Sequence, residues 1–402
     1  MKFALYEVIA DLHANRSHDA ETASFLQELG KLLDQPLQGT KLEQLPQSAL
    51  PLIFIQSGGT EGIFKQLYQE LREPYLLLTT GQNNSLAASL EILTFLQQQG
   101  KRAEILHGSP ASIAHRLKEI ARLERARQKL AGLRVGVIGQ PSDWLIASHV
   151  DPELAHKRLG LSLIDIDINE LKQAIDEVTE VPGELIDSLA KTMDPSVTEG
   201  AIRIYLALKS LVDRYELGAL TVRCFDLLGP YRNTGCIGLS LLNDAGIPAG
   251  CEGDVPALLS MVIMQALTDE PVFMANPSEI DVANNQLLVA HCTVPLAMTE
   301  SYSLHTHFES DLGIGVRGKI RPGRCTVFKL SNDCARYFVS GGEILENLER
   351  TNLCRTQLRV ALDEDANYFL RHPLGNHHLI CRDDHSALLE QLMLDLGLSR
   401  QR

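Results

Sequence analysis

The stretch LIFIQSGGTE at positions 52–61 and the stretch YLLLTTGQNNS at positions 75–85 decide the fold of the first part of the chain. Each begins with four apolar residues, passes through a turn rich in glycine and polar residues, and runs into a segment with helical spacing. Repeated strand–turn–helix units predict a parallel sheet covered by helices on both faces. Ligands gather at the carboxyl ends of such strands, so Gln82 is a candidate contact for a substrate hydroxyl. The alternative for Gln82 is ordinary turn chemistry.

The same alternation extends to both sides of this stretch and then restarts. Strands are expected at 3–9, 52–55, 75–78 and 102–106, and helices at 19–33, 63–71, 85–99 and 112–130. After Gly132 a second series follows, with strands at 134–138, 161–166, 219–226 and 247–251 and helices at 168–178, 196–216, 234–245 and 255–267. Ser196, just after Pro195, is the expected N-cap of the longest of these helices.

From about Pro271 the pattern changes. Short β-prone runs at 271–274, 286–291, 313–317, 325–329, 336–340 and 357–361 are broken by glycine turns, and a last helix is expected at 383–398. This spacing predicts an antiparallel sheet or a small barrel. The predicted fold class is therefore α/β, with two Rossmann-like parallel-sheet units followed by a C-terminal antiparallel β domain. We place the domains at 1–131, 132–270 and 271–402.

The charge and cysteine content argue against a nucleic-acid-binding protein, a membrane protein and a secreted disulfide-linked protein. The chain of 402 residues carries 37 Lys and Arg against 51 Asp and Glu, a formal net charge of −14, which argues against nucleic acid or an anionic membrane as partner. No apolar run approaches the length of a membrane span, and a charge appears too early at the N-terminus for a signal peptide. The 8 cysteines include no C-x-x-C pair, which indicates reduced thiols and a cytoplasmic location.

The segment CEGDVP at 251–256 joins an expected strand to an expected helix. One interpretation is structural: Asp254 caps the helix, Pro256 occupies its first turn, and Glu252 favours the positive helix end. The other is functional, because Glu252 lies in the turn at the carboxyl end of a strand, where α/β enzymes place their chemistry.

Three groups of histidines follow. His291, in AHCTVP at 290–295, ends an apolar strand, where a core role is common. His305 and His307 would point to the same face of a strand, a spacing that can chelate a metal but also fits two solvent-facing side chains. His377 and His378, in GNHH at 375–378, would point to opposite faces, so at most one enters a given site.

Taken as an ordered set, CEGD, the later AHCTVP and the late GNHH resemble the motifs of the L-fucose isomerase and L-arabinose isomerase superfamily. The resemblance extends through RVGVIG at 134–139 and WLI at 144–146; it covers about residues 131–402, and the first 130 only by fold pattern. It implies an enzyme that interconverts aldoses and ketoses with a divalent metal, usually manganese, and that assembles as a homo-oligomer.

Residue by residue, Glu252 resembles the first metal-binding carboxylate, which also serves as an acid/base group. His377 resembles the late metal-binding histidine, and Asn376 resembles its substrate-contacting neighbour. His291 resembles the histidine that arabinose isomerases place near their metal. Trp144, the only tryptophan, could stack on a sugar face, although a packing role fits it as well.

The second carboxylate of these enzymes does not carry over. It follows an F-rich strand, and in PVFMANP at 271–277 the corresponding position is Asn276. An asparagine carbonyl oxygen can bind a metal but cannot take a proton. Asp281, five positions further on, could substitute through a shifted loop, although a solvated turn role for Asp281 is favoured.

These residues define an expected site. A carboxylate, an amide oxygen and imidazoles form a mixed O/N set that suits Mn²⁺ or Mg²⁺, so the expected metal ligands are Glu252, Asn276, His291 and His377. Isomerisation through a cis-enediol moves a proton between C1 and C2, and the candidate acid/base groups are Glu252 and Asp281. The metal would stabilise the negative charge that develops on the sugar oxygens.

Three functions fit this pattern. The first is a metal-dependent aldose–ketose isomerase acting on a small-molecule sugar. The second is a sugar-binding protein that retains the isomerase scaffold without turnover, which the asparagine at position 276 favours. A third is another metal-assisted reaction through an enediolate, such as an aldol cleavage.

Overall fold

The computed structural model describes residues 1–10, 20–46, 48–189 and 193–401. The chain forms two compact units, Met1–Arg125 and Ala126–Arg402, and each is described by itself. The predicted helix at 19–33 begins, within the described residues, at Ala20. The second unit contains both a parallel and an antiparallel sheet. The three-domain division of the chain stays a prediction.

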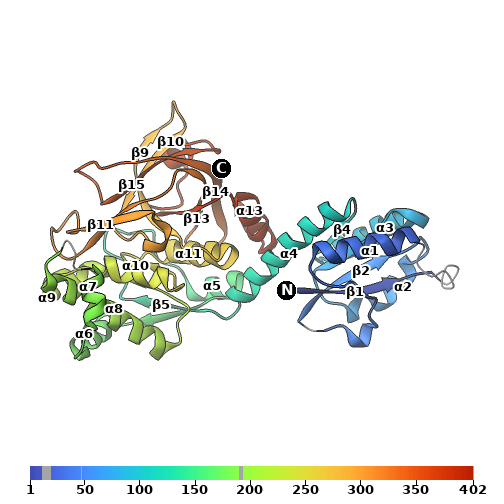
Figure 1. Ribbon diagram of the computed structural model, residues 1–402, viewed down its shortest axis with the longest axis horizontal. Helices are drawn as coiled ribbons and strands as arrows, with labels where there is room; N and C mark the ends of the chain where they lie inside the picture. Colours follow the sequence, from blue (N-terminus) through green and yellow to red (C-terminus); the bar gives the residue numbers. More distant parts are fainter. Residues whose placement is uncertain (11–19, 47, 190–192, 402) are drawn as a thin grey trace. The chain divides into compact units, whose positions relative to one another are not determined.

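The first unit is a four-stranded parallel sheet in the order β1-β2-β3-β4, covered on both faces (Figure 1). Along β2 the side chains alternate: Leu52 and Phe54 join a core with α1 and α4, whereas Ile53 and Ile55 join a core with α2 and α3. The expected doubly covered sheet is confirmed. Its elements are β1 (Lys2–Val8), α1 (Ala20–Leu32), β2 (Ala49–Ile55), α2 (Glu61–Leu67), β3 (Tyr75–Leu78), α3 (Ser85–Gln98), β4 (Ala103–Leu106) and α4 (Pro110–Leu130), which runs into the second unit.

The second unit begins with another parallel sheet, in the order β6-β5-β7-β8. The order reverses after β5, since β6 lies on one side of it and β7 on the other, and this reversal is where ligands bind in such sheets. The elements of this part are β5 (Arg134–Ile138), α5 (Pro152–Leu159), β6 (Ser162–Ile166), α6 (Ile168–Glu177), α7 (Gly183–Leu189), α8 (Pro195–Tyr215), β7 (Ala219–Val222), α9 (Leu228–Tyr231), α10 (Cys236–Asp244), β8 (Ala249–Gly250) and α11 (Val255–Thr268).

The remaining strands form a seven-stranded sheet in the order β13-β16-β9-β10-β15-β14-β17, and β13 also pairs with β14. This extra pairing closes six of the strands into a small barrel, as the glycine-broken β runs predict. A separate hairpin pairs β11 with β12. The elements are β9 (Phe273–Asp281), β10 (Gln286–His291), β11 (Ser301–His305), β12 (Gly315–Lys319), β13 (Gly323–Leu330), β14 (Arg336–Asn347), β15 (Thr356–Leu362), α12 (Tyr368–Arg371), β16 (His378–Arg382), α13 (Ser386–Asp395) and β17 (Ser399–Arg400).

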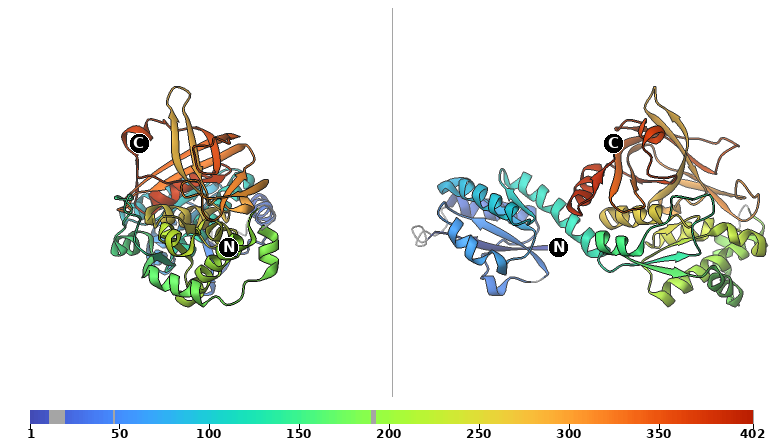
Figure 2. Two further views of the ribbon diagram at one scale, coloured as in Figure 1. Left: turned by 90° about the vertical axis from the view of Figure 1, so that its left-hand side faces the viewer. Right: turned by 180° about the vertical axis from the view of Figure 1, so that it is seen from behind.

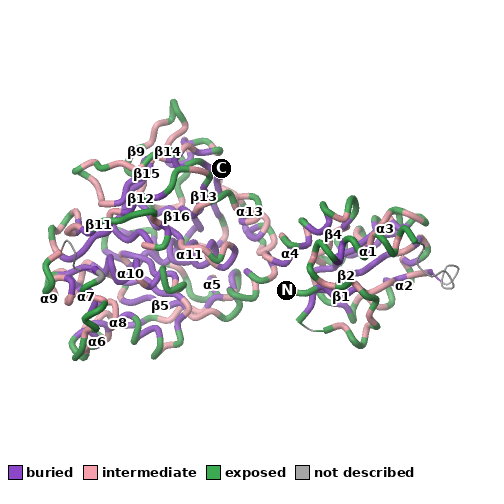
Figure 3. Tube along the Cα trace, in the orientation of Figure 1, coloured by how far each residue is buried: buried purple, intermediate pink, exposed green. Residues whose placement is uncertain are grey.

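Helix α11 links the two sheets of the second unit. It packs against β7 and β8 of the parallel sheet and against β13 and β16 of the barrel, and it lies between them in Figure 1 and in the right-hand view of Figure 2. Almost all of its residues are buried, as its colour in Figure 3 shows. A helix that is apolar all round is buried on every side. The segment just before α11 is therefore held where the parallel strands end and the barrel begins.

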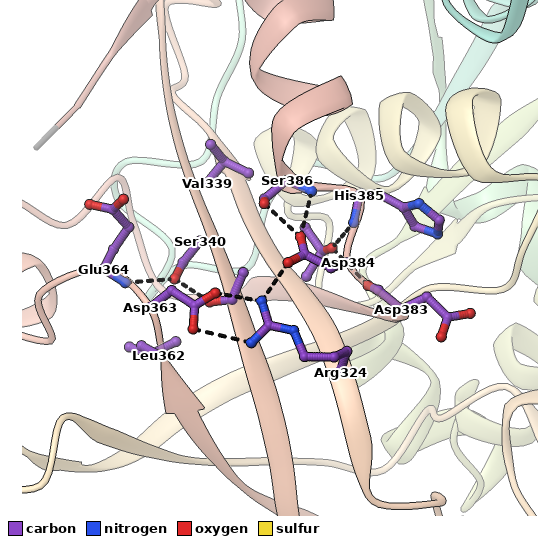
Figure 4. Close-up of polar contacts among 12 residues, drawn as sticks. Arg324, Val339, Ser340, Leu362, Asp363, Glu364, Asp383, Asp384, His385 and Ser386 are labelled. Carbon is purple, nitrogen blue, oxygen red and sulfur yellow. Dashed lines mark hydrogen bonds and ion pairs between the residues drawn. The ribbon is translucent and has the colours of Figure 1, made fainter. Parts of the chain in front are cut away.

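A network of ion pairs and hydrogen bonds connects β13 of the barrel to the start of α13. The guanidinium of Arg324 on β13 donates to both carboxylate oxygens of Asp363, at 3.2 and 2.5 Å, and also to Asp384 (Figure 4). Asp384 in turn accepts from the backbone N–H of Ser386 at the start of α13. The network holds the two chain segments that follow β15 and β16 against one edge of the barrel.

Some sequence-based boundaries are wrong. The strand expected at 219–226 ends at Val222, because the chain then turns into a short 3-10 helix at Cys224–Leu227. The N-cap of α8 is Asp194 instead of Ser196: its side chain accepts from the Ser196 N–H, and Pro195 takes the first helical position. The strand expected at 271–274 continues to Asp281 as one arm of the β9–β10 hairpin.

None of the helices in the described ranges combines the length and the apolar character that crossing a membrane requires.

Candidate metal and sugar site

Glu252 lies in the turn between β8 and α11. Its backbone is left-handed, with φ of 61°, and that of Gly253 is also left-handed, with φ of 74°. The turn is held by two backbone hydrogen bonds: Ser142 N–H donates to the Glu252 carbonyl at 2.9 Å, and Gly253 N–H donates to the Val222 carbonyl at 3.0 Å. A residue other than glycine in this conformation is uncommon and costs energy, so the surrounding structure fixes Glu252 in place.

Replacing Gly253 with alanine is expected to destabilise the turn, because a Cβ there would lie 2.8 Å from both the Gln140 carbonyl oxygen and Pro141 Cα. Left-handed strain alone costs about 1–3 kcal/mol. Gly246→Ala is a matched control, since Gly246 has φ of 81° but no atom within 4 Å of an added Cβ. Thermal unfolding should show a larger loss for Gly253→Ala; equal losses would mean that the close approach has no energetic consequence.

The Glu252 carboxylate meets three side chains. Oε2 accepts a hydrogen bond from the indole N–H of Trp144 at 2.7 Å. Oε1 lies 3.6 Å from His377 Nε2 and 4.0 Å from His291 Nε2. Burial alone would raise the pKa of Glu252, but the charge of His377, 3.6 Å away, with smaller contributions from His291 and Trp144, lowers it to about 2. Glu252 is therefore a carboxylate at neutral pH.

Neighbouring strands of the barrel bring the other candidate ligands together. His291 is the last residue of β10, and Asn276 on β9 pairs with Ala290, directly before it. On the other side of β9, His378 pairs with Ala275, which places His377 just beyond the start of β16. Residues almost 90 positions apart in sequence are thus side by side because β10, β9 and β16 are adjacent.

Glu252, His291 and His377 each present one ligand atom, and these atoms lie within 4.8 Å of one another. Two buried atoms make no hydrogen bond within the described residues: Nε2 of His377, which belongs to the cluster, and the amide oxygen Oδ1 of Asn276 on the neighbouring strand β9. Buried polar atoms without partners are rare in native proteins and point to an unseen ligand. Carboxylate, imidazole and amide oxygen donors at these separations fit a divalent metal ion.

The ring of His377 is oriented from behind by Asp254. Its Nδ1 lies 2.9 Å from Asp254 Oδ2, so this nitrogen carries the proton of the hydrogen bond and Nε2 is the one turned toward Glu252. Asp254 Oδ1 caps α11 by accepting from the Ala257 N–H at 2.9 Å and lies 3.5 Å from the buried amine of Lys329. A histidine held in this way by a carboxylate is typical of a metal ligand.

Lys329, Asp254, His377 and Glu252 form a row of neighbouring charged groups that shift one another's pKa values. Burial alone would lower the pKa of His377, but the carboxylates of Asp254 and Glu252 raise it to about 9. For Asp254, burial would raise the pKa, while the charge of Lys329 and the hydrogen bond to His377 hold it far below its usual range. His291 is different: burial and the charge of His377 lower its pKa to about 3, so its imidazole is neutral. Thr293 Oγ1, 2.9 Å from His291 Nδ1, fixes that ring.

Asp254→Asn is expected to weaken metal binding by roughly 10- to 100-fold, the usual cost of losing a partner behind a ligand. Asparagine caps a helix as well as aspartate does, so the change removes the charge and keeps the cap. Asp167→Asn, at the exposed N-cap of α6, is the matched control. Calorimetric titration with Mn²⁺ measures the effect, and an unchanged affinity would contradict the orienting role.

The rings of Trp144, Phe225 and His307 pack in a row beside the ligand cluster, and we call this row the aromatic wall. Trp144 is 54% exposed although its indole N–H is bonded to Glu252. Its ring packs edge-on against Phe225 at a centroid distance of 4.8 Å, and Phe225 packs against His307 at 5.6 Å. An exposed aromatic face next to a carboxylate is a typical environment for a sugar ring. The geometry is consistent with the substrate contact expected for Trp144.

The other expected residues lie in different places. Asn376 is exposed and directly precedes His377, and its contact with a substrate stays a prediction. Asp281 is at the far end of β9, about 16 Å of strand from Asn276, and its carboxylate accepts from the backbone and side chain of Asn284; the structure does not bring it to the cluster. Gln82 belongs to the first compact unit, so its relation to the cluster stays a prediction.

The expectation that His305 and His307 share one strand face is wrong. Strand β11 ends at His305, and His307 lies in the loop beyond it. His305 bonds to Ser303, whereas His307 is buried against Phe225 and bonds to Ser310. Of the adjacent pair 377 and 378, only the first enters the cluster: His378 bonds to the Tyr368 hydroxyl at 3.0 Å.

Sequence reasoning missed the row formed by Lys329 and Asp254 behind His377, and also Phe225. Lys329 left a detectable signal, since it is a charged residue within the apolar run CTVFKL at 325–330. A buried charge needs a partner, and Asp254 was already expected as the cap of a helix. Phe225 left none, because its segment reads as the end of a strand.

The chain matches no protein-family model. It is similar to curated proteins named sulfoquinovose isomerase: it is 23% identical over 295 residues to the protein of Alkalicoccus urumqiensis, an alignment covering 67% of this chain and 65% of that protein. It is also 23% identical over 310 residues to the proteins of Priestia aryabhattai and Priestia megaterium, covering 72% of this chain and 69% of each. The chain thus spans just under two thirds of the length of the Alkalicoccus protein.

Proposed function

We propose that the protein is a metal-dependent aldose–ketose isomerase that moves a proton between C1 and C2 of a sugar through a cis-enediol. The observation that carries this proposal is the cluster of Glu252, His291 and His377, with buried ligand atoms on His377 and Asn276 that make no hydrogen bond within the described residues and with the exposed ring of Trp144 bonded to Glu252. The names of the curated relatives support an isomerase that acts on a sugar.

In this proposal Glu252 is the acid/base group. Trp144 holds one of its oxygens, and the low pKa keeps it ionised, so it can accept the carbon-bound proton at neutral pH. With Asn276 as a neutral donor and Asp281 in the hairpin turn, the same carboxylate has to return the proton to the neighbouring carbon. A single base acting on one face of a cis-enediol is sufficient for that transfer.

His291, His377 and the Asn276 amide oxygen would hold the divalent ion together with Glu252. When bound, such an ion lowers the pKa of the sugar hydroxyls and stabilises negative charge on their oxygens. Asp254 and Thr293 keep the two imidazole rings turned toward the cluster. Mn²⁺ and Mg²⁺ are the ions that the mixed O/N donors suit.

One observation favours a second candidate, a sugar-binding protein without turnover: within the described residues, the metal cluster contains a single carboxylate. The two functions differ in one measurement. The protein is stripped with chelator, reloaded with Mn²⁺ and incubated in deuterated water with an aldose panel that includes sulfoquinovose, L-fucose and L-arabinose. Metal-dependent ketose formation with deuterium at C1 supports the isomerase, whereas binding of a sugar without exchange supports the binding protein. A cytoplasmic homo-oligomer remains part of the proposal.

A further inference from the structure

Arg355 lies directly beside the candidate metal site. It precedes β15, whose first residue, Thr356, pairs with the candidate ligand His291. Its backbone N–H points to the sulfur of Cys292, the residue after His291, at 3.5 Å. The chain at position 355 is therefore fixed one residue away from the ligand, in the neighbouring strand.

The side chain of Arg355 is held by hydrogen bonds to Thr306, but no described carboxylate neutralises its charge. Its Nε donates to the Thr306 carbonyl at 2.8 Å, its Nη2 donates to the Thr306 hydroxyl at 3.2 Å, and the guanidinium lies 5.9 Å from the centre of the Phe308 ring. Within the described residues, no ion pair joins this half-buried arginine to a carboxylate. The two arginines nearest in sequence differ, because Arg350 and Arg359 are each paired with Glu279.

His307 connects Arg355 to the acid/base group. The imidazole of His307 packs on Phe225 in the aromatic wall. Burial lowers the pKa of His307, the charge of Glu252 raises it, and the charge of Arg355 lowers it further, so both charged groups are close to this one ring. The guanidinium of Arg355 is bonded to Thr306, the residue before His307, and Phe225 and Trp144 connect His307 to Glu252.

We propose that Arg355 binds an oxyanion, a sulfonate or a phosphate, carried by the sugar on the carbon most distant from C1 and C2. This inference rests on the proposed isomerase function and adds the substrate class: an anionic sugar instead of a neutral one. A guanidinium held by two bonds to Thr306 is pre-organised, and its remaining N–H groups match the oxygens of a tetrahedral anion. The protein as a whole carries a net charge of −14 and repels anions. An arginine without a described carboxylate partner therefore gives it a local positive charge that attracts such a group.

The test compares a hexose with a 6-sulfonate, the same hexose with a 6-phosphate, and the uncharged hexose. In the metal-loaded wild type, one or both charged sugars should have the lower KM. Arg355→Gln should raise the KM of the preferred charged sugar by roughly 10- to 100-fold, the value of a hydrogen bond to a charged group, and change the uncharged hexose by less than threefold. Arg355→Lys should recover part of the loss, and the ratio between sulfonate and phosphate identifies the anion.

Arg350→Gln is the matched control, because it removes the same charge five residues away at an exposed ion pair. It should leave the preference for charged sugars unchanged. Turnover of the uncharged hexose in Arg355→Gln shows that the variant is folded. Equal KM values for charged and uncharged sugars in the wild type, or no shift in Arg355→Gln, would overturn the inference and leave the isomerase proposal intact. Failure to turn over any of the sugars would overturn the proposed function itself.

Discussion

Glu252→Gln is expected to lower turnover by roughly 10²- to 10⁴-fold, the contribution of a well-placed acid/base group. Within the described residues of the metal cluster, Glu252 is the only carboxylate, so no second group can take the proton in its place. Glutamine has nearly the same volume and still offers an oxygen to the indole N–H of Trp144, which keeps the wall in position.

The measurement separates chemistry from metal binding. Glutamine removes one negative charge from the ligand set, so turnover is compared at Mn²⁺ concentrations that saturate each variant. Glu346→Gln is the control, because Glu346 forms an exposed ion pair with Arg359. A Glu252→Gln enzyme that keeps more than a tenth of the wild-type turnover would exclude Glu252 as the base.

His377→Ala is expected to weaken Mn²⁺ binding by more than 100-fold, which is beyond the loss that removing an outer partner of a ligand causes. The ring supplies Nε2 to the cluster, so the substitution removes one of the three ligand atoms that Glu252, His291 and His377 present. The substitution also leaves the buried carboxylate of Asp254 without its hydrogen bond, so a stability loss of about 3–5 kcal/mol is expected.

His378→Ala is the matched control for that stability loss. His378 is equally buried, next in sequence, and bonded to the Tyr368 hydroxyl, but it contributes no atom to the cluster. Both variants should unfold at lower temperature, and only His377→Ala should lose the metal in a calorimetric titration of chelator-treated protein. Equal metal affinities in the two variants would contradict the assignment of His377 as a ligand.

The local pattern of the sequence was sufficient for most of the fold. The strands at 52–55 and 75–78 and the helix at 255–267 agree with β2, β3 and α11, because four apolar residues before a polar turn, or a long apolar run after an N-cap, have few other structures available. The segment after Val222 was harder. So short a segment has no periodicity to distinguish a strand from a 3-10 turn, and Cys224 and Phe225 were therefore expected in a strand.

The site was only partly predictable for a different reason. Glu252, His291 and His377 were recognised one motif at a time, but their convergence depends on β10, β9 and β16 being neighbours, which is a property of the whole barrel. The arrangement of Lys329, Asp254 and His377 joins three distant segments in the same way. The distance of Asp281 from the cluster follows from the extension of β9 to Asp281, seven residues beyond Met274, where the sequence-based strand ended.

The position of Trp144 has a practical consequence. It is the only tryptophan of the chain, and its indole N–H is bonded to the proposed base. All tryptophan fluorescence of the protein therefore originates at the candidate site and needs no label. Paramagnetic Mn²⁺ close to the ring would quench that emission, and a sugar covering its exposed face would shift it to shorter wavelength. Metal and sugar occupancy can thus be followed optically, in one cuvette, from the same side chain.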